Sequence, residues 1–319
     1  MLRRCRPALP AGCLVSVLHP RGGAPHPIRG EIVPDPDDRK RRERPLSPTP
    51  ESHTTRAAAP ELPGVLVEPS WLEERLGSGG LRLVDLRERE AYTSGHIPGA
   101  AHLELAELGS RVGELENVLL PSKEFEERMS ELGISDGDVV VAYDDQWGLA
   151  AARLVWALHY YGHDQVAVLD GGWDRWQTEG RAHAEGEEEL TRGSFQAAAP
   201  AEARADLYAD TDWIATRIGS DGLVLLDTRS PAEFDNGHLP GAIHWDWFNA
   251  VPDGSWNVSR DAEALRAEWQ TLGFDASDEV IVYCRSGMRA AHTYLVLRNA
   301  GFSRVRLYDG SWQEWSMKT

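Results

Sequence analysis

The sequence has few cysteines, no long apolar run and fewer basic than acidic residues. Only three of its 319 residues are cysteines, and two of them, Cys5 and Cys13, lie in a segment that we do not expect to fold. The cysteine content therefore does not indicate a disulfide framework. No stretch approaches the roughly 18 consecutive apolar residues of a membrane-spanning helix, so we expect no membrane partner.

The charge is distributed unevenly along the chain. The formal net charge is -18, although residues 1–60 contain 11 Lys and Arg against 6 Asp and Glu. Residues 61–319 therefore carry a charge of -23. Such an acidic body repels polyanions, which excludes nucleic acid as an expected partner. An anionic substrate would need a local cluster of positive groups.

Residues 1–60 are rich in Pro, Arg, Ala and Gly and show no periodic apolar pattern. This composition predicts a disordered tail. Residues 1–30 contain five arginines and no acidic residue, which is also typical of a targeting segment. We expect a cytoplasmic protein, with targeting by residues 1–30 as the alternative.

The remaining sequence contains two copies of the same ordered set of motifs. An apolar run ends in Asp-x-Arg at Asp85 and again at Asp227, and in both copies the turn Gly-His-x-Pro-Gly-Ala follows. These pairs are offset by 142 residues, whereas the two copies of Asp-Gly-x-Trp, at residues 170–173 and 309–312, are offset by 139. Repeated motifs in a fixed order indicate a tandem duplication.

In each copy, short apolar runs alternate with stretches whose apolar residues recur at helical spacing. This alternation predicts an α/β fold with a mainly parallel sheet flanked by helices. We predict two such domains, at residues 61–180 and 207–319, each of ordinary domain size. The Ala- and Glu-rich residues 181–206 are expected to form an exposed linker.

The two copies differ where a predicted strand meets the following predicted helix. When the copies are aligned without gaps to Asp-Gly-x-Trp, Cys284 stands opposite Asp145, and Arg289 stands opposite Ala150. The second copy thus has a thiol and, with Arg285, two guanidinium groups that the first copy lacks. We therefore predict that the second domain is catalytic and the first is inactive.

The loop of the second copy has the features of an anion site. It lies at the carboxyl end of a predicted parallel strand and before a helix N-terminus, where unpaired amides favour negative charge. Such a position favours the thiolate form of a cysteine, and the arginines add permanent positive charge. A glycine in the loop gives the backbone freedom to curl. The candidate nucleophile is Cys284, and the candidate substrate-binding residues of the loop are Arg285, Ser286, Gly287, Met288 and Arg289.

Three interpretations of this loop differ in the chemistry of Cys284. Protein phosphatases use Cys-x5-Arg, in which a wider loop encloses phosphate. Here Arg289 follows Cys284 after four residues, and Ala290 stands one position further on. The tighter loop favours a persulfide sulfur over a phosphoryl group. A buried inert cysteine, the third interpretation, explains neither the arginines nor the glycine.

The repeat and its motifs resemble those of the rhodanese family, and in particular of its two-domain thiosulfate sulfurtransferases. The resemblance covers about residues 64–180 and 207–316. It implies that Cys284 takes the outer sulfur of thiosulfate as a persulfide, releases sulfite and passes the sulfur to cyanide or a thiol. The implied partners are these small-molecule sulfur donors and acceptors. The resemblance implies no metal and no organic cofactor.

The resemblance also assigns roles to two residues outside the loop and contains two departures. Arg229 matches an arginine that orients the substrate, and Asp227 is expected to give structural support to the loop. Ser286 stands where two-domain enzymes often have a lysine, and Glu233 where they have a second arginine. Both departures reduce the positive charge around thiosulfate. Two alternatives are a 3-mercaptopyruvate sulfurtransferase, against which Arg285 argues, and a non-enzymatic persulfide relay module.

Overall fold

The computed structural model describes residues 59–199 and 203–318. Nearly all of the tail predicted over residues 1–60 lies outside the described residues. Its disorder, the targeting role of residues 1–30 and the cytoplasmic location therefore stay predictions. Within the described residues, no helix is both long enough and apolar enough to cross a membrane.

The first half contains a five-stranded sheet in which all neighbouring strands are parallel. Its central strand, β6, has the sequence Val-Val-Val-Ala-Tyr and is buried along its whole length. β-Branched residues favour strands, and a strand covered on both faces can be apolar throughout. In spatial order, the strands are β1 (Leu66–Val67), β7 (Val166–Leu169), β6 (Val139–Tyr143), β2 (Leu81–Asp85) and β3 (Ala100–His102).

The second half repeats this sheet with the same order of equivalent strands, again all parallel. In spatial order, they are β8 (Tyr208–Ala209), β12 (Val305–Tyr308), β11 (Glu279–Tyr283), β9 (Leu223–Asp227) and β10 (Ile243–His244). The predicted fold, two α/β domains with mainly parallel sheets flanked by helices, is therefore confirmed.

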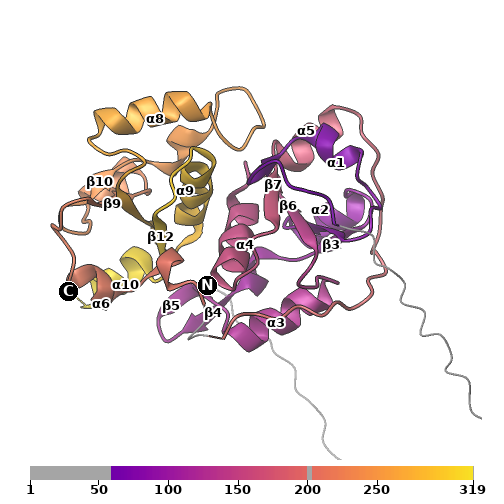
Figure 1. Cartoon of the computed structure of the whole chain (residues 1–319), viewed down its shortest axis with the longest axis horizontal. Coiled ribbons are helices and arrows are strands. Elements are labelled where there is room, and N and C mark those ends of the chain that lie inside the picture. Colours follow the sequence, from indigo (N-terminus) through magenta and orange to yellow (C-terminus); the bar gives the residue numbers. More distant parts are fainter. Residues whose placement is uncertain (1–58, 200–202, 319) are drawn as a thin grey trace, which may run out of the picture. The chain divides into compact units, whose positions relative to one another are not determined.

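Helices flank both sheets, as the ribbon shows (Figure 1). Those of the first half are α1 (Pro69–Glu73), α2 (Arg89–Ser94), α3 (Ser122–Glu131), α4 (Leu149–Tyr160) and α5 (Gly172–Thr178). Those of the second half are α6 (Thr211–Ala215), α7 (Pro231–Asp235), α8 (Ala262–Thr271), α9 (Met288–Asn299) and α10 (Ser311–Lys318). The described residues also form the 3-10 helices η2 (Leu105–Leu108), η3 (Ala205–Leu207) and η4 (Trp247–Ala250).

A small antiparallel hairpin distinguishes the first half from the second. Its strands are β4 (Gly109–Val112) and β5 (Leu115–Leu119), which pair through a register shift between Ser110 and Val112. The described part of the second half contains no such hairpin. The hairpin thus adds to the first half an element that the duplication does not repeat.

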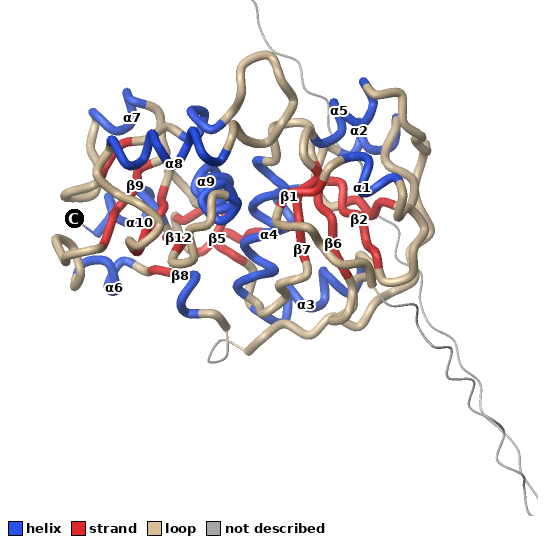
Figure 2. Tube along the Cα trace, turned by 45° about the horizontal axis from the view of Figure 1, so that its top comes forward, coloured by secondary structure: helices blue, strands red, loops and turns tan. Residues whose placement is uncertain are grey.

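Helices α4 and α9 pack against each other between the two sheets (Figures 1 and 2). Ten consecutive residues of α4 and eight of α9 are buried. A helix buried on all sides needs apolar residues around its circumference, which explains the Ala, Leu and Val residues that dominate both. Two polar side chains, Arg153 of α4 and His292 of α9, are nevertheless buried at equivalent positions of this pair.

The two halves also exchange equivalent hydrogen bonds. Asp170 Oδ1 accepts from the amide of Val258 at 2.8 Å, and Asp309 Oδ2 accepts from the amide of Leu119 at 2.9 Å. Each aspartate begins a copy of Asp-Gly-x-Trp, and the two amides stand 139 residues apart, as the two aspartates do. Reciprocal contacts between equivalent residues indicate that the two halves are related approximately as the subunits of a dimer are.

Residues 181–199, the described first part of the predicted linker, run along the first half. Ala184 and His96 exchange backbone hydrogen bonds of 2.9 Å, and the Gly193 amide donates to the carbonyl of Ser130 at 2.8 Å. Most of the segment is exposed, but Phe195 is buried in the core of the first half. The segment is therefore largely exposed, yet anchored.

Candidate active site

Cys284 lies between the end of β11 and the start of α9, and the residue is only 1% exposed. Its amide donates to Ser311 Oγ at 3.2 Å, and the amide of Gly287 donates to the same oxygen at 3.1 Å. The Ser311 hydroxyl donates in turn to the carbonyl of Tyr308 at 2.8 Å. The loop is therefore held in place from the end of β12, the strand that neighbours β11.

Ser311 is a site residue that the motifs do not indicate, because it occupies the variable position of Asp-Gly-x-Trp. Its φ is 52°, a left-handed conformation that is uncommon for a residue other than glycine. The first half has Gly172 at this position, where a Cβ would lie 2.2 Å from the carbonyl oxygen of Asp144. The exchange of glycine for serine between the two copies is the signal that identifies Ser311.

Gly287 is the N-cap of α9 and has a φ of 83°. A Cβ at this residue would lie 3.0 Å from Arg153 Nη1 and 3.2 Å from the carbonyl oxygen of Asp309. Both the conformation and the lack of space therefore require glycine. Because the loop turns here, the first amides of α9 follow directly after the segment that carries the thiol.

Arg289 forms a two-pronged ion pair with Glu233 of α7, with N–O distances of 2.7 and 2.9 Å. Glu233 also accepts from the amide and the hydroxyl of Ser230, the capping residue of α7. Arg289 is the main reason that the pKa of Glu233 is lowered to about 2. The pKa of Arg289 is raised, chiefly by Glu233 and to a smaller extent by Cys284. Arg289 thus interacts with both the thiol and the carboxylate.

The other predicted loop residues differ in exposure. Arg285 is exposed and forms no ion pair with the described residues. Ser286 and Met288 are half-buried. The hydroxyl oxygen of Ser286 accepts from Asn117 Nδ2, in the hairpin of the first half, at 3.2 Å. Cys284 is therefore followed in the loop by a residue with an exposed guanidinium and by a residue whose hydroxyl the other half contacts.

Arg229 is held by Asp227, the residue at the end of β9. Its guanidinium contacts the carboxylate of Asp227 at 2.6 and 2.9 Å, donates to the carbonyl of Gly237 at 2.6 Å and stacks over Trp312. Its side chain is 2% exposed. Arg87 makes the same contacts in the first half, which has no thiol. The geometry therefore favours a structural role for Arg229, and the predicted role in orienting the substrate stays a prediction.

The structure corrects the ungapped alignment of the two loops. Tyr143 and Tyr283 end equivalent strands, because the hydroxyl of each accepts a backbone amide of the Gly-His-x-Pro turn of its own half. The residue that follows Tyr143 is Asp144, so Asp144 and not Asp145 is the counterpart of Cys284. The loop of the first half contains one additional residue. An ungapped alignment that starts from Asp-Gly-x-Trp therefore misplaces every residue before this insertion.

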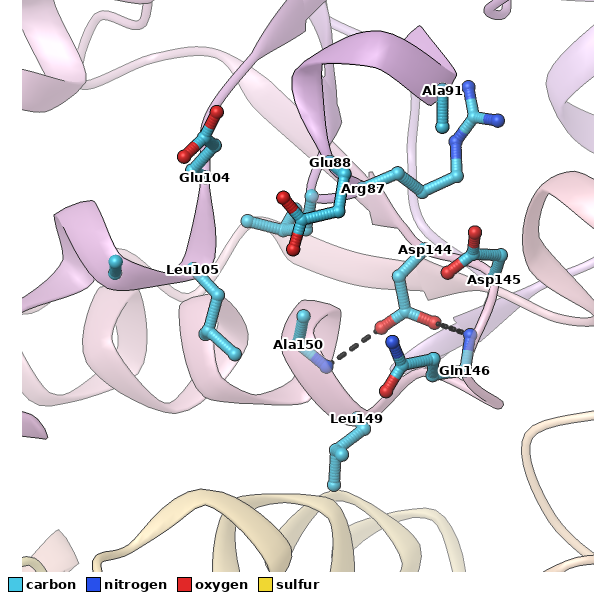
Figure 3. Close-up of a pocket in the computed structure, with 12 residues that line it drawn as sticks. Arg87, Glu88, Ala91, Glu104, Leu105, Asp144, Asp145, Gln146, Leu149 and Ala150 are labelled. Carbon is cyan, nitrogen blue, oxygen red and sulfur yellow. Dashed lines mark hydrogen bonds between the residues drawn. The ribbon is translucent and has the colours of Figure 1, made fainter. Parts of the chain in front are cut away.

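The carboxylate of Asp144 fills the loop of the first half. It accepts from four backbone amides at 2.8 to 3.0 Å, and Figure 3 shows two of them. These amides belong to Gln146, Gly148, Ala150 and Ala151. Burial raises the pKa of Asp144, and the four amides oppose that rise. The loop of the first half therefore holds a carboxylate of the chain itself in the place where it could bind a separate anion.

A cavity of about 190 Å³ lies beside this loop. Its walls include Glu88, Glu104 and Asp145, with Ala91 and Ala150 where the second half has Glu233 and Arg289 (Figure 3). The cavity therefore lacks the thiol and the ion pair of the second half. Within the described residues, no three His, Cys, Asp or Glu side chains are placed to hold a metal ion.

Comparison with solved structures supports the fold. The crystal structure of SseA from Escherichia coli, described as a 3-mercaptopyruvate sulfotransferase with a rhodanese fold, matches with a TM-score of 0.71 and 27% identity. The match covers 78% of this chain and 99% of SseA.

Comparison with known sequences identifies the family. A thiosulfate sulfurtransferase of Corynebacterium glutamicum is 34% identical over 276 residues, which cover 79% of this chain and 88% of that protein. The sulfur carrier protein TtuD of Thermus thermophilus is 31% identical over 272 residues, which cover 79% of this chain and 94% of TtuD. The rhodanese-like domain family matches twice, over residues 68–179 and 210–318. The chain therefore belongs to the rhodanese family, as two rhodanese-like domains in tandem.

Proposed function

We propose that the protein is a sulfurtransferase in which Cys284 carries sulfur as a persulfide, taking it from thiosulfate and passing it to cyanide or a thiol. One observation carries the proposal. At the same strand end, the first half holds a carboxylate with four amides, whereas the second half has a thiol beside Arg289. Because the loop of the first half binds a carboxylate, the equivalent loop of the second half is suited to bind an anionic sulfur.

The proposed reaction has two steps. The Cys284 thiolate attacks the outer sulfur of thiosulfate, the S–S bond breaks, and its electron pair leaves with sulfite. Cyanide then attacks the outer sulfur of the persulfide, which gives thiocyanate and restores the thiolate. Arg289 and the first-turn amides of α9 stabilise the negative charge during both steps.

We propose that Arg285 makes the first contact with the sulfur donor as it binds. It is exposed and forms no ion pair with the described residues, whereas Arg289 is already paired with Glu233. The names of the relatives from Corynebacterium glutamicum and Azotobacter vinelandii support thiosulfate as the donor, because both are thiosulfate sulfurtransferases. The structural match to SseA supports 3-mercaptopyruvate as an alternative donor.

A second candidate function is a persulfide relay with little turnover of free thiosulfate. The ion pair between Glu233 and Arg289 favours it, because the carboxylate cancels one of the charges that would attract a dianion. The name of TtuD, a sulfur carrier protein, also supports it.

The test is intact-mass measurement of the full chain after incubation with thiosulfate, with 3-mercaptopyruvate or with a small-molecule persulfide. We expect a gain of one sulfur from thiosulfate, which cyanide removes and which Cys284→Ser abolishes. Asp144→Asn serves as the matched change in the first half and is expected to load normally. Loading by the persulfide alone that Cys284→Ser abolishes would favour the relay, and a sulfur adduct on Cys284→Ser after incubation with thiosulfate would contradict the proposal.

A further inference from the structure

The hairpin of the first half contacts the catalytic loop of the second through one side chain. Asn117, in β5, donates from Nδ2 to the hydroxyl oxygen of Ser286 at 3.2 Å. We propose that Asn117 is a positioning residue that orients the Ser286 hydroxyl and so helps to select the sulfur donor. The proposal rests on the function proposed above and adds to it a contribution from the half that has no thiol.

The backbone of Asn117 is held by a buried ion pair. Its carbonyl accepts from Arg153 Nη2 at 2.8 Å, and the same nitrogen lies 2.6 Å from Asp309 Oδ1. The side chains of Arg153 and Asp309 are 1% and 3% exposed. Asn117 has a φ of 57°, a left-handed conformation that asparagine adopts more readily than most residues other than glycine.

The residues beside Asn117 are tied to the segment that holds the thiol loop. Glu116 exchanges two hydrogen bonds with the side chain of Gln313 through its backbone amide and carbonyl, at 3.1 and 2.8 Å. Leu119 donates to Asp309. The segment that contains Asp309 and Gln313 also contains Ser311, which holds the amides of Cys284 and Gly287. The hairpin is therefore hydrogen-bonded to the segment that holds the catalytic loop.

The contact determines what the Ser286 hydroxyl can do. A serine hydroxyl has one hydrogen to donate and two lone pairs that accept. Because Asn117 occupies one lone pair as a donor, the hydrogen of Ser286 is directed elsewhere and can be donated to a bound ligand. An oxygen of the leaving group of the donor, such as a sulfonate oxygen of thiosulfate, is the acceptor that the reaction supplies. Cyanide has no such oxygen, so only the first step should depend on Asn117.

The first half lacks this arrangement at the equivalent position. Trp147 stands where the second half has Ser286, and Trp256 stands two residues before Val258 as Asn117 stands two before Leu119. The indole of Trp147 donates to the carbonyl of Ser255, so this contact joins an aromatic side chain to the backbone. The amide-to-hydroxyl contact therefore occurs at the loop that carries the thiol and has no equivalent at the loop filled by Asp144.

The test compares Asn117→Gly, Ser286→Ala and the double variant in the full chain. Glycine accepts the left-handed backbone, so Asn117→Gly removes the side chain alone. We expect each single variant to lower kcat/KM for thiosulfate by about three- to tenfold, the effect of one hydrogen bond. The double variant should lose no more than the larger single loss, because both changes remove the same hydroxyl contact. For cyanide, kcat/KM should stay within about twofold, because that step lacks the oxygen acceptor.

Two further variants sharpen the result. Asn117→Asp offers only acceptors, so Ser286 must donate to it, and we expect a loss at least as large as that of Asn117→Gly. Glu116→Gln changes the neighbouring side chain, which points to Arg111, and should leave both constants unchanged. Wild-type kinetics for Asn117→Gly, additive losses in the double variant or an equal loss for cyanide would overturn the inference. A wild-type chain that takes no sulfur from thiosulfate would overturn the proposed function itself.

Discussion

At the residue scale, Glu233 determines how much of the charge of Arg289 is available to a substrate. The carboxylate is part of the cap of α7 and at the same time contacts both terminal nitrogens of Arg289. A dianionic donor must therefore approach a guanidinium that already has a partner. We therefore expect this pairing, and not only the number of arginines in the loop, to affect the choice of donor.

Replacing Glu233 by Gln should improve the use of thiosulfate. Glutamine retains the capping interaction with Ser230 but removes the negative charge beside Arg289. We expect KM for thiosulfate to fall by about threefold to tenfold at low ionic strength, with a smaller change in high salt because the charge is partly exposed. Steady-state kinetics at two salt concentrations measure this. An unchanged KM at both salt concentrations would contradict the prediction.

Sequence patterns are sufficient to predict some residues of the site but not others. The positions of Cys284 and Arg289 in a strand-loop-helix segment follow from hydrophobic periodicity and from the repeat. The partners of the loop do not, because Asn117 is 169 residues away from Ser286 and belongs to a hairpin outside the repeat. Asp144 was missed for another reason, namely that an insertion of one residue shifted the comparison of the two loops.

At the element scale, the packing of α4 against α9 buries two imidazoles that must stay neutral. Burial lowers the pKa of His292 in α9 to about 4 and that of His159 in α4 to about 4. His292 Nε2 lies 3.1 Å from the carbonyl oxygens of both Trp147 and Val258, which belong to different halves. This contact is possible only with a hydrogen on Nε2, which the neutral ring provides.

The helix pair should therefore make the protein sensitive to acid. The unfolded chain takes up protons at these imidazoles near pH 6.5, whereas the folded protein does so only near pH 4. The two histidines leave the free energy of unfolding unchanged above about pH 6.5, lower it as the pH falls, and have their full effect near pH 4. Each histidine accounts for a loss of about 3 kcal/mol.

Urea unfolding followed between pH 7 and pH 4 measures this loss. His292→Asn, which retains an N–H donor for the two carbonyls but does not titrate, should reduce the pH dependence by about half. An unchanged pH dependence in this variant would show that the acid sensitivity arises elsewhere.

The arrangement of elements was the part of the structure that the sequence predicted best. Continuous apolar runs such as that of β6 identify buried parallel strands, and Gly162 and Gly301 mark the ends of helices α4 and α9. The hairpin of β4 and β5 has no such signal, because its strands are short and contain polar and charged residues. Its conformation depends on contacts with the second half, which local sequence does not encode.

At the scale of the whole molecule, the two halves are joined through their Asp-Gly-x-Trp motifs. Asp309 contributes more to the contact between the halves than Asp170 does, because it also pairs with the buried Arg153 of the first half. Nη1 of Arg153 has no hydrogen-bond partner within the described residues, so Asp309 is the carboxylate that balances this buried charge.

Asp309→Asn should therefore destabilise the protein more than the equivalent change, Asp170→Asn. Loss of one member of a buried ion pair lowers the free energy of unfolding by about 3 to 5 kcal/mol. Asp170 lies 3.4 Å from Arg175, which also pairs with Glu68 and Glu179, so its loss leaves no charge without a partner. Denaturant titration of both variants measures the difference, and equal losses would contradict it.

The filled loop of the first half has a consequence for motion. Amides that donate to the carboxylate of Asp144 are held in closed hydrogen bonds at all times, so their hydrogens should exchange slowly with solvent. In the second half, the matching amide of Gly287 donates to Ser311, whereas those of Arg289 and Ala290, in the first turn of α9, have no hydrogen-bond partner among the described residues while Cys284 is a free thiol. They should exchange quickly in the resting protein and slow down when a persulfide occupies the loop. We therefore expect the duplicated chain to combine a permanently rigid loop with one whose rigidity changes as Cys284 is loaded with sulfur.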